Sequence, residues 1–227
     1  MAARSTRTII VVTGGDALAP GQLPDLPPDA LVVAADSGVD RAQALGLHVD
    51  LAVGDFDSVS AVGLARAAEG GAAVDRHPEA KDATDLELAL SVAAAQGPER
   101  IVVLGGHGGR LDHLLANAHA LADPSLAGIE VVAQMGDAIV TVVRPGPPAR
   151  LTGGRGDLVT LLPVQGPAIA VRTDGLLYPL ADEDLPPGST RGVSNELVAA
   201  TAAVSLREGV LLAIQPGVAG THQLRNP

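Results

Sequence analysis

The first two thirds of the chain alternate short apolar runs with longer stretches rich in Ala and Leu. The runs consist mostly of Val, Ile and Ala and end in Gly or Asp, which is typical of strands buried on both faces. The stretches between them have the length and composition of helices. This alternation predicts a parallel sheet with helices on both faces. The expected strands lie at residues 8–12, 30–36, 72–78, 100–106 and 129–134.

The pattern changes at residues 144–154, where the sequence reads RPGPPARLTGG. The helical pattern ends there, and only short strand-like segments follow. We therefore predict an α/β domain over residues 1–144 and a smaller antiparallel β domain over residues 147–227. The last two segments are separated by REG, a turn of hairpin length that predicts their pairing. The segments lie at residues 157–164, 168–173, 201–206 and 210–215.

The composition limits both the core and the partners. Apolar residues make up 47% of the 227 residues, but there is one Phe, one Tyr and no Trp, so small aliphatic side chains must fill the core. A net charge of −11 argues against a nucleic-acid partner. The absence of cysteine excludes disulfides and thiolate chemistry. We also expect a cytoplasmic protein that does not enter a membrane, because no apolar run approaches a membrane span or signal peptide.

The segment KDATD begins an expected helix at residues 81–85. Thr84 followed by Glu87 matches a capping box. Lys81 is the only lysine among the 15 Lys and Arg residues, and a cation before a helix N-terminus opposes the helix dipole. Lysine and a helix N-terminus together favour a bound phosphate. The alternative is that Asp82, Thr84 and Asp85 merely start the helix.

The segment VGDFDSVS, residues 53–60, carries two carboxylates that are two residues apart. In an extended segment, Asp55 and Asp57 point to the same side. They then repel each other unless a cation lies between them. Oxygen ligands near a phosphate indicate Mg²⁺. The alternative is an acidic surface turn, although Phe56, the only Phe, is an unusual residue for a solvated turn.

Two further segments follow expected strands. GGHGGRLDH at residues 105–113 lets backbone N–H groups approach an anion, and Arg110 can bind phosphate oxygens with its planar fork. In VVAADSGVD, Ser37 and Asp40 resemble a helix cap, while Asp36 at the strand end is better placed to contact a ligand. Ligands bind beyond the carboxyl ends of strands in open α/β sheets. One rim is therefore expected to carry Gly14, Gly15, Asp36, Gly105 and Gly106.

Taken together, these motifs resemble the thiamine pyrophosphokinase family. The matching segments are ADSGVD, GDFDS, KDATD and GGRLDH, and GDFDS with KDATD at this distance is the most specific part. TDGLLYPL, GVSNE and EGVLLAI continue the likeness, which extends from about Ala34 to Ile214.

The resemblance implies an enzyme that transfers diphosphate from ATP to the hydroxyethyl group of thiamine, with Mg²⁺, and releases AMP. It also implies an α/β nucleotide-binding domain, a C-terminal β-sandwich, and a homodimer with thiamine between the subunits. Two alternatives stay open: a related pyrophosphokinase acting on a pterin alcohol, and a non-catalytic nucleotide or thiamine sensor. The complete set of acidic residues favours an enzyme over a sensor.

The resemblance also assigns roles to individual residues. Asp55, Asp57 and Asp85 hold the metal, and Lys81, Asp82, Arg110 and Asp112 surround the polyphosphate and the reacting hydroxyl. The nucleotide is expected to lie against Asp36, Ser37, Gly38, Thr84, Gly105, Gly106 and Gly109. Thiamine is expected to contact Tyr178, Ser194 and Asn195.

Overall fold

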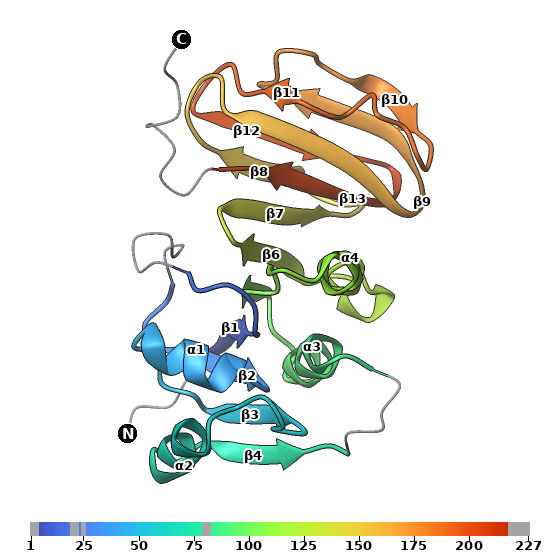
Figure 1. Ribbon diagram of the computed structural model, residues 1–227. Coiled ribbons are helices and arrows are strands. Elements are labelled where there is room, and N and C mark those ends of the chain that lie inside the picture. The colour runs from blue at the N-terminus through green and yellow to red at the C-terminus, as the bar shows by residue number, and fades with distance from the viewer. Residues whose placement is uncertain (1–4, 19–22, 24–25, 79–82, 218–227) are drawn as a thin grey trace. The chain divides into compact units, whose positions relative to one another are not determined.

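A computed structural model describes residues 5–18, 23, 26–78 and 83–217 of the chain (Figure 1). The chain divides into two compact units, unit 1 at residues 1–136 and unit 2 at residues 137–227, which are described separately. Unit 1 combines a parallel sheet with helices, and unit 2 is built from antiparallel strands. The predicted fold class is therefore confirmed.

Unit 1 contains a parallel sheet in the order β4-β3-β2-β1-β5-β6. Its central strands are continuous apolar runs, as burial on both faces requires. The chain runs outward from β1 to β4 and then returns to place β5 on the other side of β1. This leaves a topological switch point between β1 and β5, where ligands bind in such sheets. The strands are β1 (Ser5–Val12), β2 (Ala30–Ala35), β3 (Leu51–Gly54), β4 (Ala73–Arg76), β5 (Arg100–Leu104) and β6 (Glu130–Met135).

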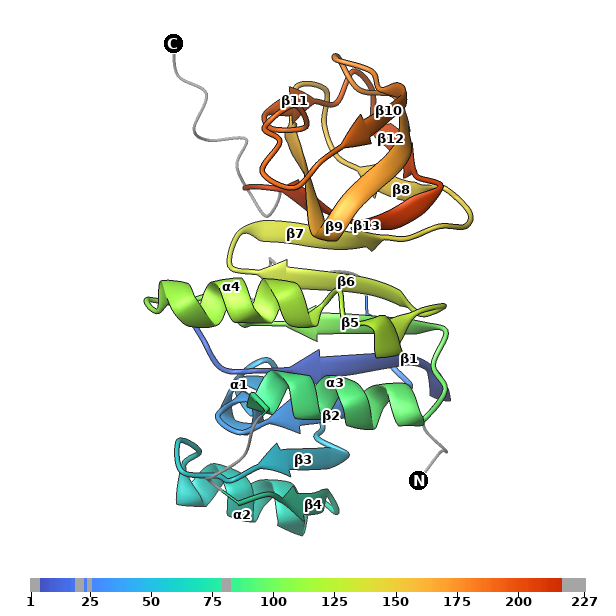
Figure 2. The same cartoon turned by 90° about the vertical axis from the view of Figure 1, so that its right-hand side faces the viewer.

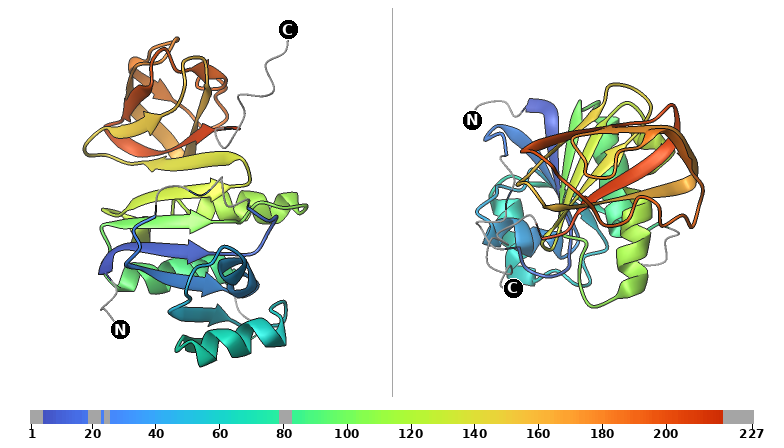
Figure 3. Two further views of the ribbon diagram at one scale, coloured as in Figure 1. Left: turned by 90° about the vertical axis from the view of Figure 1, so that its left-hand side faces the viewer. Right: turned by 90° about the horizontal axis from the view of Figure 1, so that it is seen from above.

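Helices cover both faces of this sheet. Figure 2 shows α3 and α4 on one face, and Figure 3 shows α1 and α2 on the opposite face. Helix α3 packs on β1, β2 and β3, and α1 packs on β1 and β2. The helices are α1 (Gly38–Ala44), α2 (Ala61–Glu69), α3 (Asp85–Ala95), α4 (Leu111–Ala120) and the short 3-10 helix η2 (Pro124–Leu126).

Unit 2 is organised around one long strand, β9 (Leu158–Asp174). Its first half pairs with β13, and its second half pairs with β10 and β12. Between the halves, Gln165 and Gly166 have φ angles of 61° and 140°, so the strand bends and passes from one small sheet to the other. The sheets enclose an apolar core. The other strands are β7 (Ala138–Val143), β8 (Ala149–Thr152), β10 (Ala181–Leu185), β11 (Asn195–Glu196), β12 (Thr201–Ser205) and β13 (Glu208–Gln215).

Several elements differ from the prediction. The hairpin across REG is wrong, because β12 pairs with β8 and β9 whereas β13 pairs with β7 and β9. Segments 157–164 and 168–173 are parts of one strand, β9. Strand β3, helix α2 and strand β7 were not among the expected elements.

The boundary between the units also lies elsewhere. The chain divides after Gly136, whereas the prediction placed the boundary at residues 144–147. Strand β7 pairs along its length with β13 and therefore belongs to unit 2. In the part of the chain that the structure describes, no helix has both the length and the hydropathy needed to cross a bilayer.

Candidate active site

The carboxyl ends of β1, β2, β3 and β5 open into a cleft of about 770 Å³ within unit 1. Its lining comes from residues 13–15, 35–37, 55, 57, 58, 83–86 and 106–110 and from helix α4. This is the edge of the sheet that the topological switch point predicts. Of the five residues expected on one rim, Gly14, Gly15, Asp36 and Gly106 line this cleft.

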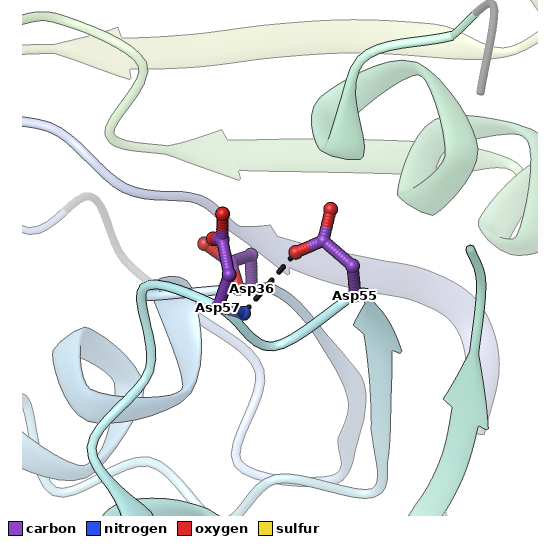
Figure 4. A group of neighbouring side chains, drawn as sticks. All are labelled: Asp36, Asp55 and Asp57. Carbon is purple, nitrogen blue, oxygen red and sulfur yellow. Dashed lines mark hydrogen bonds between the residues drawn. The ribbon is translucent and has the colours of Figure 1, made fainter. Parts of the chain in front are cut away.

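Three carboxylates converge in this cleft (Figure 4). Asp36, Asp55 and Asp57 each offer an oxygen, and these oxygens lie within 4.8 Å of one another. Asp36 is buried, and no described residue gives its Oδ1 a hydrogen bond. Burial raises the pKa of Asp36, and the negative charges of Asp85, Asp57 and Asp55 raise it further, against a backbone hydrogen bond from Ser37. Such an arrangement is electrostatically suited to a bound cation.

The turn that carries Asp55 and Asp57 is not extended, which corrects the prediction. Phe56 has a left-handed conformation with φ 65°, and the Asp57 N–H donates to Asp55 Oδ1 over 3.2 Å. The Phe56 side chain is only 9% exposed and packs into the core of unit 1. Gly54 has φ 147°, and a Cβ there would lie 3.3 Å from the Asp36 backbone. Glycine at this position therefore allows Asp36 to approach the turn.

The start of α3 supplies a fourth carboxylate to the same cleft. Thr84 Oγ1 accepts a hydrogen bond from the Glu87 N–H over 3.2 Å, which confirms the predicted cap. Asp85 lies in the first turn of α3 and lines the cleft. The resemblance implied Asp55, Asp57 and Asp85 as metal ligands. In the structure, the third carboxylate that converges with Asp55 and Asp57 is Asp36. The predictions for Lys81 and Asp82 fall outside the described residues.

The glycine-rich segment after β5 is bonded to the segment after β1. The Gly106 N–H donates to the Gly14 carbonyl over 2.8 Å, and the Gly105 N–H donates to the Gln134 carbonyl over 3.0 Å. These two N–H groups therefore serve the fold and are not available to an anion. Gly109 lies in open space at the cleft, since a Cβ there would have no neighbour within 4 Å.

Arg110 and Asp112 form an ion pair at the mouth of the cleft. The Arg110 Nη2 atom lies 2.5 Å from Asp112 Oδ2, and Nε lies 3.2 Å from Oδ1. The hydrogen bond from Arg110 lowers the pKa of Asp112 to about 2. Both side chains are well exposed. Of the two, Arg110 lines the cleft.

Helix α1 positions Ser37 and Gly38. Gly38 packs directly on β1, because a Cβ there would lie 2.1 Å from the Val12 carbonyl. Ser37 occupies the N-cap position of α1, as expected, but it makes no side-chain cap hydrogen bond. Asp40 instead accepts hydrogen bonds from Ser60 N–H over 2.8 Å and Ser60 Oγ over 2.7 Å. Ser60 caps α2, so Asp40 links α1 to α2.

Sequence reasoning missed several polar side chains of the cleft, which are Thr13, Ser58, His107, His113 and Asn117. His107 and Asn117 both line it, and Asn117 Nδ2 donates to the Gly106 carbonyl over 3.0 Å. The spacing of four between His113 and Asn117 puts both on one face of α4, so helical periodicity could have indicated Asn117. It carries no information on His107, which lies in the loop before α4.

Tyr178, Ser194 and Asn195 lie together in unit 2. Asn195 is 4% exposed; its Oδ1 accepts from the Tyr178 N–H over 3.0 Å, and its Nδ2 donates to the Tyr178 carbonyl over 2.7 Å. The Ser194 N–H donates to Thr160 Oγ1 over 3.1 Å. Tyr178 itself is 56% exposed. Asn195 thus supports the backbone of an exposed tyrosine.

An open parallel sheet with an acidic, glycine-bordered cleft beyond its strand ends is typical of enzymes that act on nucleotides with a divalent metal. The family model "Thiamin pyrophosphokinase, catalytic domain" matches residues 26–133, and "Thiamin pyrophosphokinase, vitamin B1 binding domain" matches residues 149–211. The chain belongs to the thiamine pyrophosphokinase family, transferases that make thiamine diphosphate with ATP as co-substrate.

Individual relatives agree with this assignment. The chain is 28% identical to the thiamine pyrophosphokinase of Bacillus subtilis over 213 residues, which cover 92% of this chain and 98% of that protein. The crystal structure of the Bacillus subtilis enzyme has a TM-score of 0.78, with the same coverage and 27% identity. That of thiamin pyrophosphokinase from Geobacillus thermodenitrificans has a TM-score of 0.75 and 29% identity, covering 96% of this chain and all of that one. The pterin and sensor alternatives are not favoured.

Proposed function

We propose that the cleft of unit 1 binds ATP as its magnesium complex and is the place where thiamine receives diphosphate. The observation that carries this proposal is the convergence of Asp36, Asp55 and Asp57 within 4.8 Å. The donor set is all oxygen, as Mg²⁺ prefers. Asp36 Oδ1 is buried, and no described residue gives it a hydrogen bond. The residues present therefore fit the metal.

Metal ligation is assigned to Asp36, Asp55 and Asp57, whose oxygens converge, with Asp85 as a further carboxylate of the cleft. When bound, Mg²⁺ offsets negative charge on the phosphate oxygens. The chain's own contribution is to hold several carboxylates close together despite their repulsion. Burial raises the pKa of Asp36, and the charges of Asp85, Asp57 and Asp55 raise it further.

The phosphate groups are assigned to Arg110, to Lys81 and to residues 107–109 of the glycine-rich loop. Arg110 is paired with Asp112, and an incoming phosphate competes for the same guanidinium. Once Arg110 turns to phosphate, the cause of the low Asp112 pKa is removed. Asp112 then becomes a better proton acceptor, and we assign it, together with Asp82, to the neighbourhood of the thiamine hydroxyl.

In this scheme the hydroxyl oxygen of thiamine forms a bond to the β-phosphorus of ATP. The bond between that phosphorus and the oxygen bridging to the α-phosphate breaks, AMP leaves, and a carboxylate takes the hydroxyl proton. Positioning and charge neutralisation dominate such transfers. Ser37, Gly38 and Thr84 surround the nucleotide, and Gly105 and Gly106 shape its loop.

Unit 2 is assigned to thiamine, through Tyr178, Ser194 and Asn195. The match to the vitamin B1 binding model over residues 149–211 supports this. We further propose a homodimer with thiamine bound between subunits, in the cytoplasm. Light scattering of the purified protein tests the dimer.

Product analysis tests the reaction. Purified protein with Mg²⁺, ATP and thiamine is expected to yield thiamine diphosphate and AMP in equal amounts, and neither product after chelation of the metal. ADP with thiamine monophosphate would contradict the transfer of diphosphate. Turnover without any divalent metal would contradict the role of the acidic cleft.

A further inference from the structure

The turn that carries Asp55 and Asp57 is supported from the neighbouring strand by Arg76, which the scheme above does not use. Arg76 is the last residue of β4 and stands opposite Gly54 in the register between β3 and β4. The pairing continues one step further, because the His77 N–H donates to the Gly54 carbonyl over 2.9 Å. Arg76 is therefore fixed beside the residue that precedes Asp55.

The Arg76 side chain contacts two consecutive residues of the turn. Its Nη1 donates a hydrogen bond to the backbone carbonyl of Asp55 over 2.7 Å. Its guanidinium carbon lies 4.8 Å from the centroid of the Phe56 ring, within the range of a cation–π contact. One planar group thus holds both the peptide that enters Phe56 and the ring of Phe56 itself.

Phe56 needs this support because of its backbone conformation. A positive φ is an outlier for a bulky residue, and Phe56 has φ 65°. This conformation sets the direction in which the chain leaves toward Asp57, and hence the convergence of Asp57 with Asp36 and Asp55. The Phe56 ring is buried in the core and anchors the turn there, and Arg76, on the exposed edge strand β4, packs against the ring.

We propose that Arg76 is a positioning residue for the metal-binding carboxylates. The inference rests on the proposed function, and within it only on the cation site. The direction of the change in cation affinity distinguishes this role from a purely electrostatic one. A positive charge beside a cation site weakens cation binding through space, so removing charge alone would strengthen binding. Loss of positioning weakens it.

The experiment measures Mn²⁺ binding by electron paramagnetic resonance, without ATP or thiamine. Arg76→Ala is expected to raise the Kd about tenfold, the lower end for residues that orient metal ligands. That factor corresponds to about 1.4 kcal/mol. Arg76→Lys is expected to recover only part of the loss, because an ammonium group lacks the planar fork. In kinetics, the Mg²⁺ needed for half-activation is expected to rise while KM for thiamine stays constant.

Arg7→Ala is the matched control. Arg7 is an exposed arginine of unit 1 that pairs with the Glu99 carboxylate, and it lies in the first half of β1, away from the carboxyl ends of the strands. The Arg7→Ala substitution removes one positive charge, as Arg76→Ala does, and is expected to leave the Kd for Mn²⁺ unchanged. Phe56→Leu keeps a buried apolar side chain but removes the aromatic face, and a smaller rise in Kd is expected. This variant keeps the test decisive if Arg76→Ala fails to fold.

An Arg76→Ala Kd equal to or below that of the wild type would overturn the inference, as would full recovery with Arg76→Lys. Wild-type protein that binds no Mn²⁺ would be a different failure, because it would remove the proposed cation site itself.

Discussion

Asp36 in unit 1 and Asn195 in unit 2 are both buried polar residues next to predicted ligand sites, but their surroundings differ. Both ends of the Asn195 amide are bonded to the backbone of Tyr178. Asp36 has an oxygen to which no described residue donates, and it faces three other carboxylates. A buried polar group is normally hydrogen-bonded, so the exception calls for an explanation. The comparison separates a residue whose hydrogen bonds serve the fold from one that the proposed function assigns to a bound cation.

The largest effect is expected from the carboxylates. Asp57→Asn is isosteric and removes one charge of the converging group. We expect kcat/KM to fall by more than about a hundredfold, because even residues that only orient metal ligands cost 10–100-fold. The fold is expected to stay intact in circular dichroism. A variant with near wild-type activity at ordinary Mg²⁺ would rule out ligation by Asp57.

Lys81→Arg is the next test, and it extends the comparison to a residue known only from the sequence. Charge is conserved, so a purely electrostatic role predicts no change. A fitted contact to a phosphate oxygen predicts a loss near a hundredfold in kcat/KM for ATP, since errors of position near 1 Å have that effect. This equals roughly 2.7 kcal/mol at 1.36 kcal/mol per factor of ten. Unchanged kinetics would reduce the lysine to an ordinary residue before a helix.

Asn195→Ala tests the structural side of the comparison. It leaves the Tyr178 N–H and carbonyl without their partners, which is expected to lower the free energy of unfolding by about 1–3 kcal/mol. Urea unfolding measures it. Ser194→Ala is the control, because Ser194 donates its hydrogen bond to Thr160 from the backbone N–H, which alanine keeps. Equal stability of the two variants would contradict the supporting role of Asn195.

Asp36→Asn is expected to raise the stability of the protein, opposite to Asn195→Ala, and its effect is expected to be the smallest of the four. Because the folded pKa of Asp36 is raised, its ionised form opposes folding at neutral pH. The variant is therefore expected to melt slightly above the wild type at pH 7 without metal. The difference in melting temperature should vanish as the pH falls below the unfolded pKa of about 3.9, because the Asp36 carboxyl group is then protonated in both the folded and the unfolded state. A variant that melts below the wild type at pH 7 would indicate that Asp36 stabilises the fold.

The sequence predicted the strands of unit 1 that are long and apolar, and it identified most residues of the cleft. It missed β3, because LAVG is only four residues long and runs directly into the GDFDS turn. It also predicted an extended turn, since the left-handed conformation of Phe56 depends on burial and on Arg76 from another strand. Asp40 shows the same limit. Its bonds to Ser60 connect two helices, and local capping patterns carry no such information.

In unit 2 the strand pairing could not be predicted, because the paired strands lie far apart along the chain. REG has the length of a hairpin turn, but β9 is 17 residues long and offers both of its halves as partners. Strands β12 and β13 therefore pair with β9 and not with each other. Of the metal ligands taken from the resemblance, Asp55 and Asp57 converge in the structure, and Asp36 joins them from a neighbouring strand end.

Anomalous diffraction from crystals soaked in Mn²⁺ tests the central claim most directly. The account predicts a manganese peak in the cleft of unit 1, in contact with carboxylate oxygens of Asp36, Asp55 and Asp57. The contrary result is a cleft without manganese at a concentration that supports turnover, or an ion bound away from all three carboxylates.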